Sequence, residues 1–472
     1  MRDAWIKCAC CAAALFGSAQ LIAPNAAHAQ SGPVETPSTW GGDFWSRPRL
    51  TGDWAGVRDQ LGIKGVVLDV DAQLMPQSVV SGGRDTDSAF WGNAAYTLNL
   101  DSQKMGFWPG GFVKVQGVST FGNSLFGDIG AVVPANETWV FPAVNDPSSA
   151  LMSATFTQFL SPKFGLFAGK INTLDLAFTR FTGDYRSQFL NLGMNIPMAE
   201  ALVPISTFGG GVVVIPSESL NFSALVVDPS GTPTDNDVSG AFSDGIMGIG
   251  AGKLNIKPFG LGGQQRLTGI WSNKERVSLI QDPSNIGQFL LTERFPLLGN
   301  PGPILRRILE RFAPSLLNPA QQLNQEDSTW AVAYGFDQYI WQPGNDPERG
   351  IGLFFNFGLS DGDANPVKYS YNVGIGGNGV IPGRPRDRFG IGWARTEFSD
   401  NFVPALRQTL DLGLDHEDAV EMYYNAAITQ WMNLTVDLQV INPGLKKTLG
   451  SNDTLTDVGT AVVVGLRSHI RF

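Results

Sequence analysis

The 472-residue sequence has little charge and only one long apolar run. Charged residues make up 16% of it and aromatic residues 11%, which excludes a disordered protein, since such chains carry more charge and fewer aromatics. A polytopic helical membrane protein needs several apolar runs of about 20 residues, and the one long run lies at the N-terminus, over Cys8–Pro24. The net charge is −10 and no run of five or more Lys and Arg residues occurs, so we expect no nucleic-acid partner.

Cysteine and histidine are also scarce. The three cysteines are Cys8, Cys10 and Cys11, and the histidines beyond residue 29 are His416 and His469. The rest of the chain therefore has no disulfide, thiolate nucleophile or Cys-ligated metal site. Two histidines also make a His-rich metal site unexpected, so we expect no metal and no cofactor.

The N-terminus has the pattern of a cleaved secretory signal. Arg2 and Lys7 flank the start of the apolar run, and Ala27-His28-Ala29 has the small-x-small spacing of a cleavage site. A membrane anchor is the alternative, and it is less favoured because Pro24 breaks the short run. We expect residues 1–29 to be removed on export.

Apolar and polar residues alternate with a period of two along the chain. Successive side chains of a β-strand point to opposite faces. In the last segment Val464 and Leu466 share one face, whereas Arg467, His469 and Arg471 share the other. This segment therefore has one apolar face and one cationic face.

Sixteen such segments are expected, and the connections between them alternate in length. The segments are 66–75, 93–101, 111–121, 151–160, 164–171, 211–216, 220–227, 245–255, 265–273, 329–340, 350–360, 367–376, 388–397, 420–429, 433–441 and 461–472. Connections such as 122–150 and 172–210 are long, whereas 161–163 and 217–219 are short. This alternation is typical of an up-and-down transmembrane barrel. It fails once, where connection 361–366 should be long and the following connection 377–387 should be shorter.

Two architectures fit these strands, a soluble β-rich fold and a membrane barrel. Lipid offers no partner to backbone groups, so only a closed barrel lets strands span a bilayer. A terminal strand ending at Phe472 would be an awkward edge in a sandwich. We therefore predict an all-β transmembrane antiparallel up-and-down β-barrel over residues 66–472. Aromatic residues near strand ends fit interfacial girdles, namely Trp91, Phe107, Trp108, Trp330, Trp341 and Trp431.

Two short helices are expected outside the strands. In residues 30–65, which we expect on the periplasmic side, Asp53 is placed to cap a helix over Trp54–Leu61. In the long outer loop 274–328, apolar residues recur at helical spacing over 303–313.

Several sequence blocks, taken together, resemble one known family. The blocks are Arg49–Val66, Gln265–Ser272, Ser360–Pro366, Arg386–Gly392, Glu421–Gly444 and the terminal Arg471-Phe472. They are similar to the carbohydrate-selective outer-membrane porins of the OprB type. The resemblance implies a sixteen-stranded channel for mono- or small oligosaccharides in a Gram-negative outer membrane, with lipid around it. It also implies recognition of Phe472 by the barrel-assembly machinery, and it leaves a homo-oligomer open.

A lining that selects sugars needs hydrogen-bonding side chains and weak binding, so that the solute can leave. The candidates on the polar strand faces are Asp69, Asp71, Gln73, Lys114, Gln116, Asp437, Gln439, Arg467, His469 and Arg471. Connection 172–210 adds Arg180, Asp184 and Arg186 among apolar residues. It either folds into the barrel and narrows it or packs as a surface loop.

Two alternatives remain at this stage. The cationic face of the last strand also fits a general or weakly anion-selective porin, and a secreted soluble sugar-binding protein or hydrolase is the second alternative. Gly374–Gly379 imitates a dinucleotide fingerprint, and Asp361–Asn365 imitates the start of a calcium loop. A dinucleotide fingerprint should be followed by a helix, but Pro382 stands there, and a calcium loop requires Gly where Pro366 stands. We therefore expect a channel and no enzyme.

Overall fold

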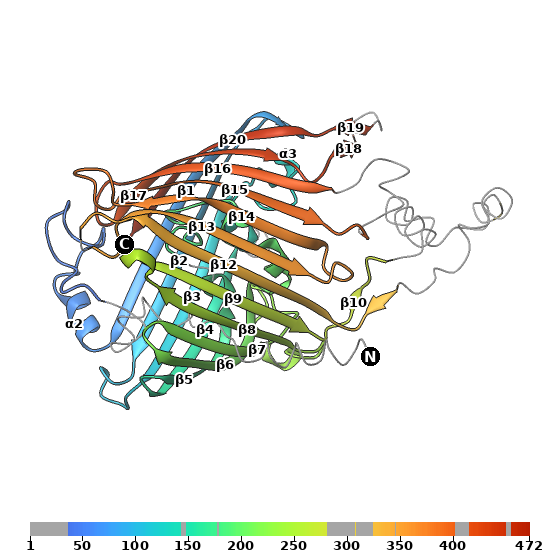
Figure 1. The fold of residues 1–472 in the computed structure, drawn as a ribbon. Helices are drawn as coiled ribbons and strands as arrows, with labels where there is room; N and C mark the ends of the chain where they lie inside the picture. The colour runs from blue at the N-terminus through green and yellow to red at the C-terminus, as the bar shows by residue number, and fades with distance from the viewer. Residues whose placement is uncertain are drawn as a thin grey trace.

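The computed structural model describes residues 36–142, 148–176, 179–280, 307, 324–344, 346–401, 415–449 and 455–472. Within these ranges, sixteen antiparallel strands form a closed barrel in which the last strand pairs with the first (Figure 1). No helix in the described ranges is long and apolar enough to cross a membrane.

The barrel is built in chain order. Its strands are β1 (Val66–Gly83), β2 (Ser88–Asp101), β3 (Gly111–Gly122), β4 (Ser149–Ser161), β5 (Phe164–Asn172), β6 (Ser206–Ser217), β7 (Leu220–Val227), β8 (Met247–Ile256), β9 (Gly263–Ser272), β12 (Thr329–Trp341), β13 (Gly350–Ser360), β14 (Val367–Asn378), β15 (Arg388–Phe398), β16 (His416–Ala427), β17 (Met432–Asn442) and β20 (Gly459–Arg471).

The connections carry short elements of their own. These are the helices α2 (Val57–Ile63), α3 (Phe126–Ile129) and α4 (Leu192–Asn195), the 3-10 turns η2 (Glu137–Val140), η3 (Thr173–Leu176), η4 (Met198–Leu202), η5 (Val238–Gly240) and η6 (Pro258–Gly260), and the small strands β10 (Arg276–Val277), β11 (Gln325–Glu326), β18 (Lys447–Leu449) and β19 (Leu455–Asp457).

Each of the sixteen predicted segments coincides with a barrel strand, which confirms the fold class. Some predicted segments are too short. Strand β1 continues beyond residue 75 to Gly83, and β6 begins at Ser206 rather than at 211. Backbone pairing continues there although Gly and Ser interrupt the apolar alternation. Connection 361–366 is indeed short, and β13 and β14 pair in regular antiparallel register on either side of it.

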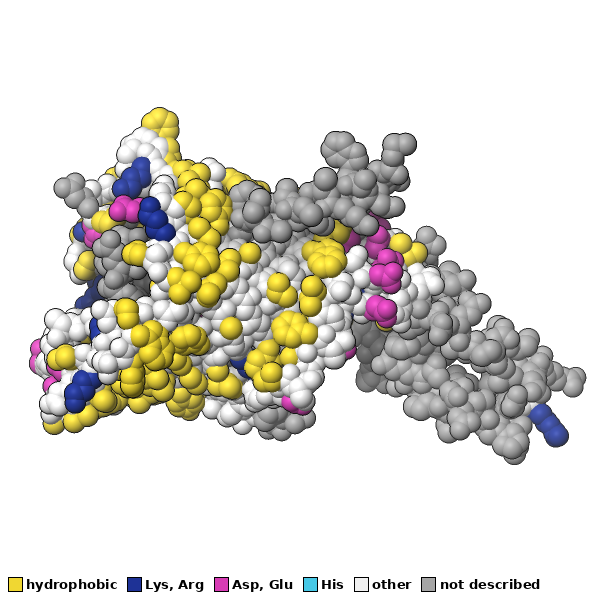
Figure 2. Space-filling view, turned by 90° about the horizontal axis from the view of Figure 1, so that it is seen from below, with side chains coloured by type: hydrophobic (Ala, Val, Ile, Leu, Met, Phe, Trp, Pro, Cys, Tyr) yellow, Lys and Arg dark blue, Asp and Glu magenta, His cyan; other side chains and the backbone are white. Residues whose placement is uncertain are grey.

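The alternation sorts side chains between the outside and the lumen. On β20, Val464 and Leu466 are exposed on the outer face, whereas Arg467 and His469 are buried on the lumenal face. Figure 2 shows hydrophobic side chains spread along the lateral surface, with charged side chains mostly toward the two ends. Such a surface suits lipid and argues against the soluble alternative.

The two ends of the barrel differ. The end that carries α2, the short turns and the C-terminus is called the short-turn end here, and the opposite end is called the long-loop end (Figure 1). The Arg58 guanidinium of α2 donates to the main-chain oxygen of Phe472 at 2.9 Å and to Asp69 Oδ1 at 2.8 Å. The N-terminal segment is therefore attached to both ends of the barrel sequence.

Helix α2 begins later than the predicted Trp54–Leu61. Trp54 and Ala55 have left-handed backbone angles, with φ of 54° and 57°, and Gly56 is the N-cap with φ of 88°. The helix therefore runs over Val57–Ile63, and Asp53 does not cap it. The helix predicted over 303–313 lies outside the described residues apart from Arg307.

The predicted aromatic girdle is correct only in part. Phe107, Trp108, Trp330 and Trp341 are exposed. Trp91 instead points into the lumen, where it packs with Met75 and Leu190. Trp431 is buried under the N-terminal segment and donates its indole N–H to the Phe44 carbonyl at 2.8 Å.

Candidate functional site

Two long connections fold into the barrel. We call residues 123–142 and 148 the first inner loop, and residues 173–176 and 179–205 the second inner loop. Buried residues of both loops, such as Val133 and Leu192, pack with Val118, Met152 and Phe398 of the barrel wall. Connection 172–210 therefore enters the barrel, and the surface-loop alternative is wrong.

Two glutamates of β16 hold the backbones of these loops. Glu417 accepts hydrogen bonds from the N–H groups of Val132 at 2.7 Å and Val133 at 3.1 Å in the first inner loop. Glu421 accepts from Leu190 at 2.6 Å and Asn191 at 2.9 Å in the second. One strand thus anchors both loops.

The strands beside β16 add further anchors. The Arg467 guanidinium donates to the carbonyls of Tyr185 and Gln188, the latter at 2.6 Å. Gln439 donates to the Ala135 carbonyl at 2.8 Å. We call the lumenal face of β16, β17 and β20 the clamped wall. The predicted lining residues Arg467, Gln439 and Asp437 are fully buried in it, and Asp437 accepts from Gln439 at 3.1 Å.

Glycines on the lumenal face of β13, β14 and β15, next to the clamped wall, provide space for the second inner loop. A Cβ at Gly352 would lie 2.5 Å from the Phe181 ring, and a Cβ at Gly376 would also overlap that ring. At Gly390 a Cβ would lie 2.8 Å from the Phe189 ring. The fingerprint-like glycine stretch around Gly376 is therefore a socket for an aromatic side chain.

Charged residues of the second inner loop form ion pairs with three parts of the wall. Asp175 pairs with Lys114 of β3, and Arg180 pairs with Asp337 of β12 at 2.9 Å. Asp184 pairs with Arg388 of β15 at 3.2 Å. The four charged groups of Lys114, Asp175, Asp184 and Arg388 are 18–38% exposed. These loop–wall ion pairs present both hydrogen-bond donors and acceptors to solvent in the lumen.

The remaining predicted residues differ in role. Asp69 holds Arg49 and Arg58 of the N-terminal segment, each at 2.8 Å, and so lies in a structural ion-pair network. His469 contacts Asp71 at 3.1 Å. Gln73 donates to the Tyr185 carbonyl at 3.4 Å, and Gln116 accepts from Asn172 at 3.1 Å. The Arg186 guanidinium lies 4.5 Å from the centre of the Tyr185 ring. The backbone of Arg471 hydrogen-bonds to the backbones of Trp431 and Leu50.

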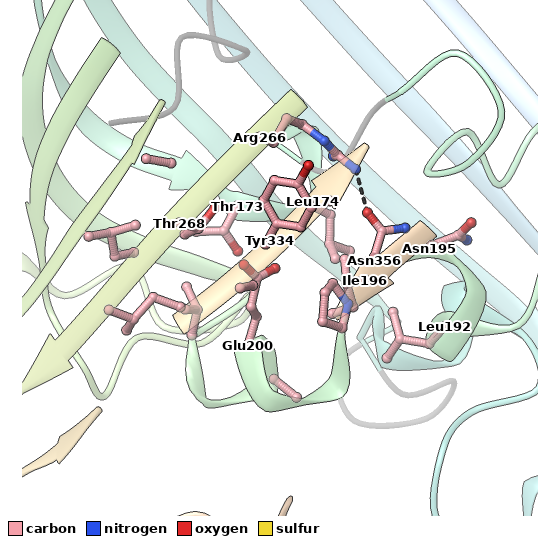
Figure 3. Close-up of a pocket in the computed structure, with 18 of the residues that line it drawn as sticks. Thr173, Leu174, Leu192, Asn195, Ile196, Glu200, Arg266, Thr268, Tyr334 and Asn356 are labelled. Atoms are coloured by element: carbon pink, nitrogen blue, oxygen red, sulfur yellow. Dashed lines mark hydrogen bonds between the residues drawn. The ribbon is translucent and has the colours of Figure 1, made fainter. Parts of the chain in front are cut away.

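A cavity of ≈ 260 Å³ lies between the second inner loop and the lumenal faces of β8, β9 and β12 (Figure 3). Arg266 lines it and donates to Asn356 Oδ1 at 2.6 Å. Glu200 of η4 projects into it from the loop. Burial raises the pKa of the Glu200 carboxyl to about 7. A second cavity of ≈ 310 Å³ on the other side of η4 shares the lining residue Ala201.

The lumenal side chains around the first cavity change in polarity along the barrel axis. Ile249 pairs with Ile270 nearest the long-loop end, Ala251 pairs with Thr268 in the middle, and Lys253 pairs with Arg266 nearer the short-turn end. We call the lumenal face of β7, β8, β9 and β12 the open wall, because this cavity lies along its strands β8, β9 and β12.

Sequence reasoning missed several of these residues. Glu417, Glu421, Lys253, Arg266 and Asp337 were not among the candidates, although each lies on the polar face of a predicted strand segment or its extension. The alternation signal would have found them had it been applied to every strand. The contacts with the inner loops, which decide which of these residues bond to a loop and which line the cavity, leave no periodic pattern in the sequence.

In the segment Asp361–Asn365, which imitates the start of a calcium loop, the Asp361 carboxylate accepts backbone N–H groups. Asp361 Oδ1 accepts the N–H groups of Asp363, Ala364 and Asn365, and Oδ2 accepts the N–H of Trp330 at 2.9 Å. The carboxylate is therefore used within a turn. The described residues contain no cluster of His, Cys, Asp and Glu suited to a metal ion.

Comparison with known proteins identifies the family. The model of the carbohydrate-selective porin, OprB family, matches residues 86–472. This chain belongs to the OprB family. Membership of this porin family implies an outer-membrane location.

Individual relatives are more distant. The curated Porin B of Pseudomonas aeruginosa is 28% identical over 156 residues, which is 30% of this chain and 32% of the relative. The high-pH structure of Pseudomonas putida OprB matches with a TM-score of 0.72 and 20% identity, covering 91% of this chain and all of that one. The low-pH structure gives 0.52 and 15%, covering 91% of this chain and 99% of that one. These structures support the fold of this OprB-family chain.

Proposed function

We propose that the barrel lets mono- and small oligosaccharides diffuse across the outer membrane. The observation that carries the proposal is the set of loop–wall ion pairs, which remain partly exposed in the lumen. Paired charges of opposite sign create little net field. They nevertheless offer strong donors and acceptors to hydroxyl groups, which both donate and accept hydrogen bonds.

The lining we assign to this path combines predicted and newly found residues. It comprises Asp71, Lys114, Asp175, Arg180, Asp184, Arg186, Arg388 and Arg471, with Lys253, Arg266 and Glu200 around the cavity. Arg467, Gln439 and Asp437 of the clamped wall are left out because they are buried, and Arg467 and Gln439 bond to the inner loops. The alternative of a general or weakly anion-selective porin depended on the cationic face of Arg467, His469 and Arg471. It is weakened because Arg467 bonds to the second inner loop and His469 contacts Asp71.

Planar-bilayer recording with a panel of sugars tests the proposal. We expect sugar-dependent reduction of current with millimolar affinity, about 4 kcal/mol of binding free energy, and a reversal potential near zero in asymmetric salt. Unchanged current with every sugar, together with a strongly anion-selective reversal potential, would support the general porin instead. We also infer that transport involves no chemistry, so sugars recovered from the far side are expected to be unaltered.

The chain outside the barrel has separate proposed roles. We propose that residues 1–29 are a cleaved signal and that residues 30–65 lie in the periplasm. Phe472 is proposed to be recognised by the barrel-assembly machinery, and homo-oligomer formation remains a proposal as well. N-terminal sequencing of the protein from outer membranes tests the first point, with Gln30 expected as the first residue.

A further inference from the structure

The cavity on the open wall is amphipathic along the barrel axis. Nearest the long-loop end, Ile249 and Ile270 face the apolar residues Leu174, Val203 and Ile205 of the second inner loop. Nearer the short-turn end, the paired strands place Lys253 beside Arg266. A solute seated here meets aliphatic side chains at one end and cations at the other.

The polar end offers donors and acceptors together. Arg266 and Lys253 can donate, Glu200 can accept, and the Thr268 hydroxyl, which also lines the cavity, can do both. Asn356, which receives the Arg266 hydrogen bond, also lines this end. A carboxylate can only accept, and Glu200 would repel it, whereas sugar hydroxyls satisfy both kinds of group.

Buried polar atoms around this end have capacity for further hydrogen bonds. Within the described residues, Arg266 Nε, Gln264 Nε2, Asp337 Oδ2 and the Ser223 hydroxyl have no hydrogen-bond partner. The register places these residues on adjacent strands within two positions of Lys253 or Arg266. Buried polar groups are normally paired, because an unpaired one costs free energy. Arg266 lines the cavity itself, so a hydroxylated ligand there would supply a partner for its Nε.

The apolar end of the cavity lacks the aromatic rings on which sugar rings usually stack. Of the residues that line the cavity in the described part of the chain, only Tyr334 is aromatic. Tyr334 is at an exposed position of β12, between the buried Ala333 and Gly335. The lumenal surface is therefore aliphatic. It would bury an apolar substituent but has no ring on which a second pyranose could stack.

We propose that this cavity is a subsite for glycosides whose sugar carries an apolar alkyl or aryl group, with the sugar at Lys253, Arg266 and Glu200 and the apolar group against Ile249 and Ile270. This inference rests on the proposed sugar-transport function and specifies one substrate class for it. The sugar end lies deeper in the barrel, and the apolar end lies nearer the long-loop end.

Current block by matched solutes tests the subsite in the reconstituted full-length protein. Phenyl β-D-glucoside and cellobiose share a glucoside with a six-membered second ring, which is apolar in the first and hydroxylated in the second. We expect phenyl β-D-glucoside to block at about tenfold lower concentration, the factor expected from burying roughly 60 Å² of apolar surface. Equal blocking concentrations in the wild-type protein would overturn the subsite.

A pair of variants locates the preference. In Ile249→Thr/Ile270→Thr, hydroxyls replace part of the aliphatic surface, so the ratio of the two blocking concentrations is expected to fall toward one. The matched control is Val213→Thr, a buried position on β6 outside the cavity lining. An undiminished ratio in the double variant, with normal barrel migration on unheated gels, would overturn the assignment to this cavity.

The outcomes separate this inference from the proposed function. If glucose and cellobiose reduce the current but phenyl β-D-glucoside has no advantage, sugar transport stands and the subsite fails. If no sugar alters the current, both fail together.

Discussion

The clamped wall and the open wall have the same strand pattern but use their polar side chains differently. On β16, the buried Glu417 and Glu421 bond to loop backbone. On β8 and β9, Lys253 and Arg266 line a cavity instead. The difference comes from the inner loops, whose backbones bond to β16 and β20 and which leave a cavity beside β8, β9 and β12. A polar residue on the lumenal face of a porin strand is thus not by itself a solute contact.

The largest expected effect comes from breaking the clamp. In Glu417→Ala/Glu421→Ala, four loop N–H groups lose their acceptors, and we expect the docked loops to lose about 5 kcal/mol of stabilisation. Single-channel conductance should rise and block by sugars should weaken. Glu417→Gln/Glu421→Gln keeps one acceptor oxygen at each site and is expected to change conductance less. Identical conductance in the Ala variant and the wild type would show that the loops do not depend on these anchors.

Filling the aromatic socket should have the next largest effect. Gly376→Val places a side chain where the Phe181 ring lies, so the second inner loop is expected to lose about 3 kcal/mol of packing. Protease sensitivity of the loop in the assembled barrel measures this. The control is Gly248→Val, because the atom nearest to a Cβ there is 4.0 Å away. Adding Phe181→Ala to Gly376→Val should restore part of the protection, and no restoration would argue against a direct clash.

A substitution on the open wall should affect the solute and leave the loops in place. Arg266→Gln removes a charged donor from the cavity, and we expect the blocking concentration of glucose to rise about tenfold. Conductance without sugar should change little. The control is Lys257→Gln, in the exposed short turn after β8, which removes one positive charge outside the cavity. If Lys257→Gln weakens block as much as Arg266→Gln does, the effect is long-range electrostatics.

The smallest expected effect is a pH dependence of ion selectivity. Burial raises the pKa of Glu200 to about 7, so this carboxyl is mostly neutral at pH 6 and mostly ionised at pH 8. The cavity should therefore favour anions slightly more at pH 6, which reversal potentials at the two pH values would measure. Glu200→Gln should remove this part of the pH dependence. A shift of the same size in Glu200→Gln would assign it to another group.

The sequence predicted the fold almost completely, because strand alternation repeats sixteen times and each repeat is a local signal. The lining was harder to predict. Asp437 and Lys114 are both polar residues on lumenal faces, yet Asp437 is buried in the clamped wall and Lys114 is partly exposed beside Asp175. What separates them is the path of the inner loops, which depends on contacts such as Phe181 with Gly376, nearly two hundred positions along the chain. Spacing within one strand carries no information about such contacts.

Cysteine accessibility tests the division between the two walls most directly, since the chain has no cysteine after Cys11. Thr268→Cys on the open wall and Thr435→Cys on the clamped wall would each be exposed, in a planar bilayer, to a charged thiol reagent added at the long-loop end. We predict that Thr268→Cys reacts, that its current falls, and that glucose slows the reaction, whereas Thr435→Cys stays unmodified. Rapid modification at residue 435 with none at 268 would contradict the path along the open wall.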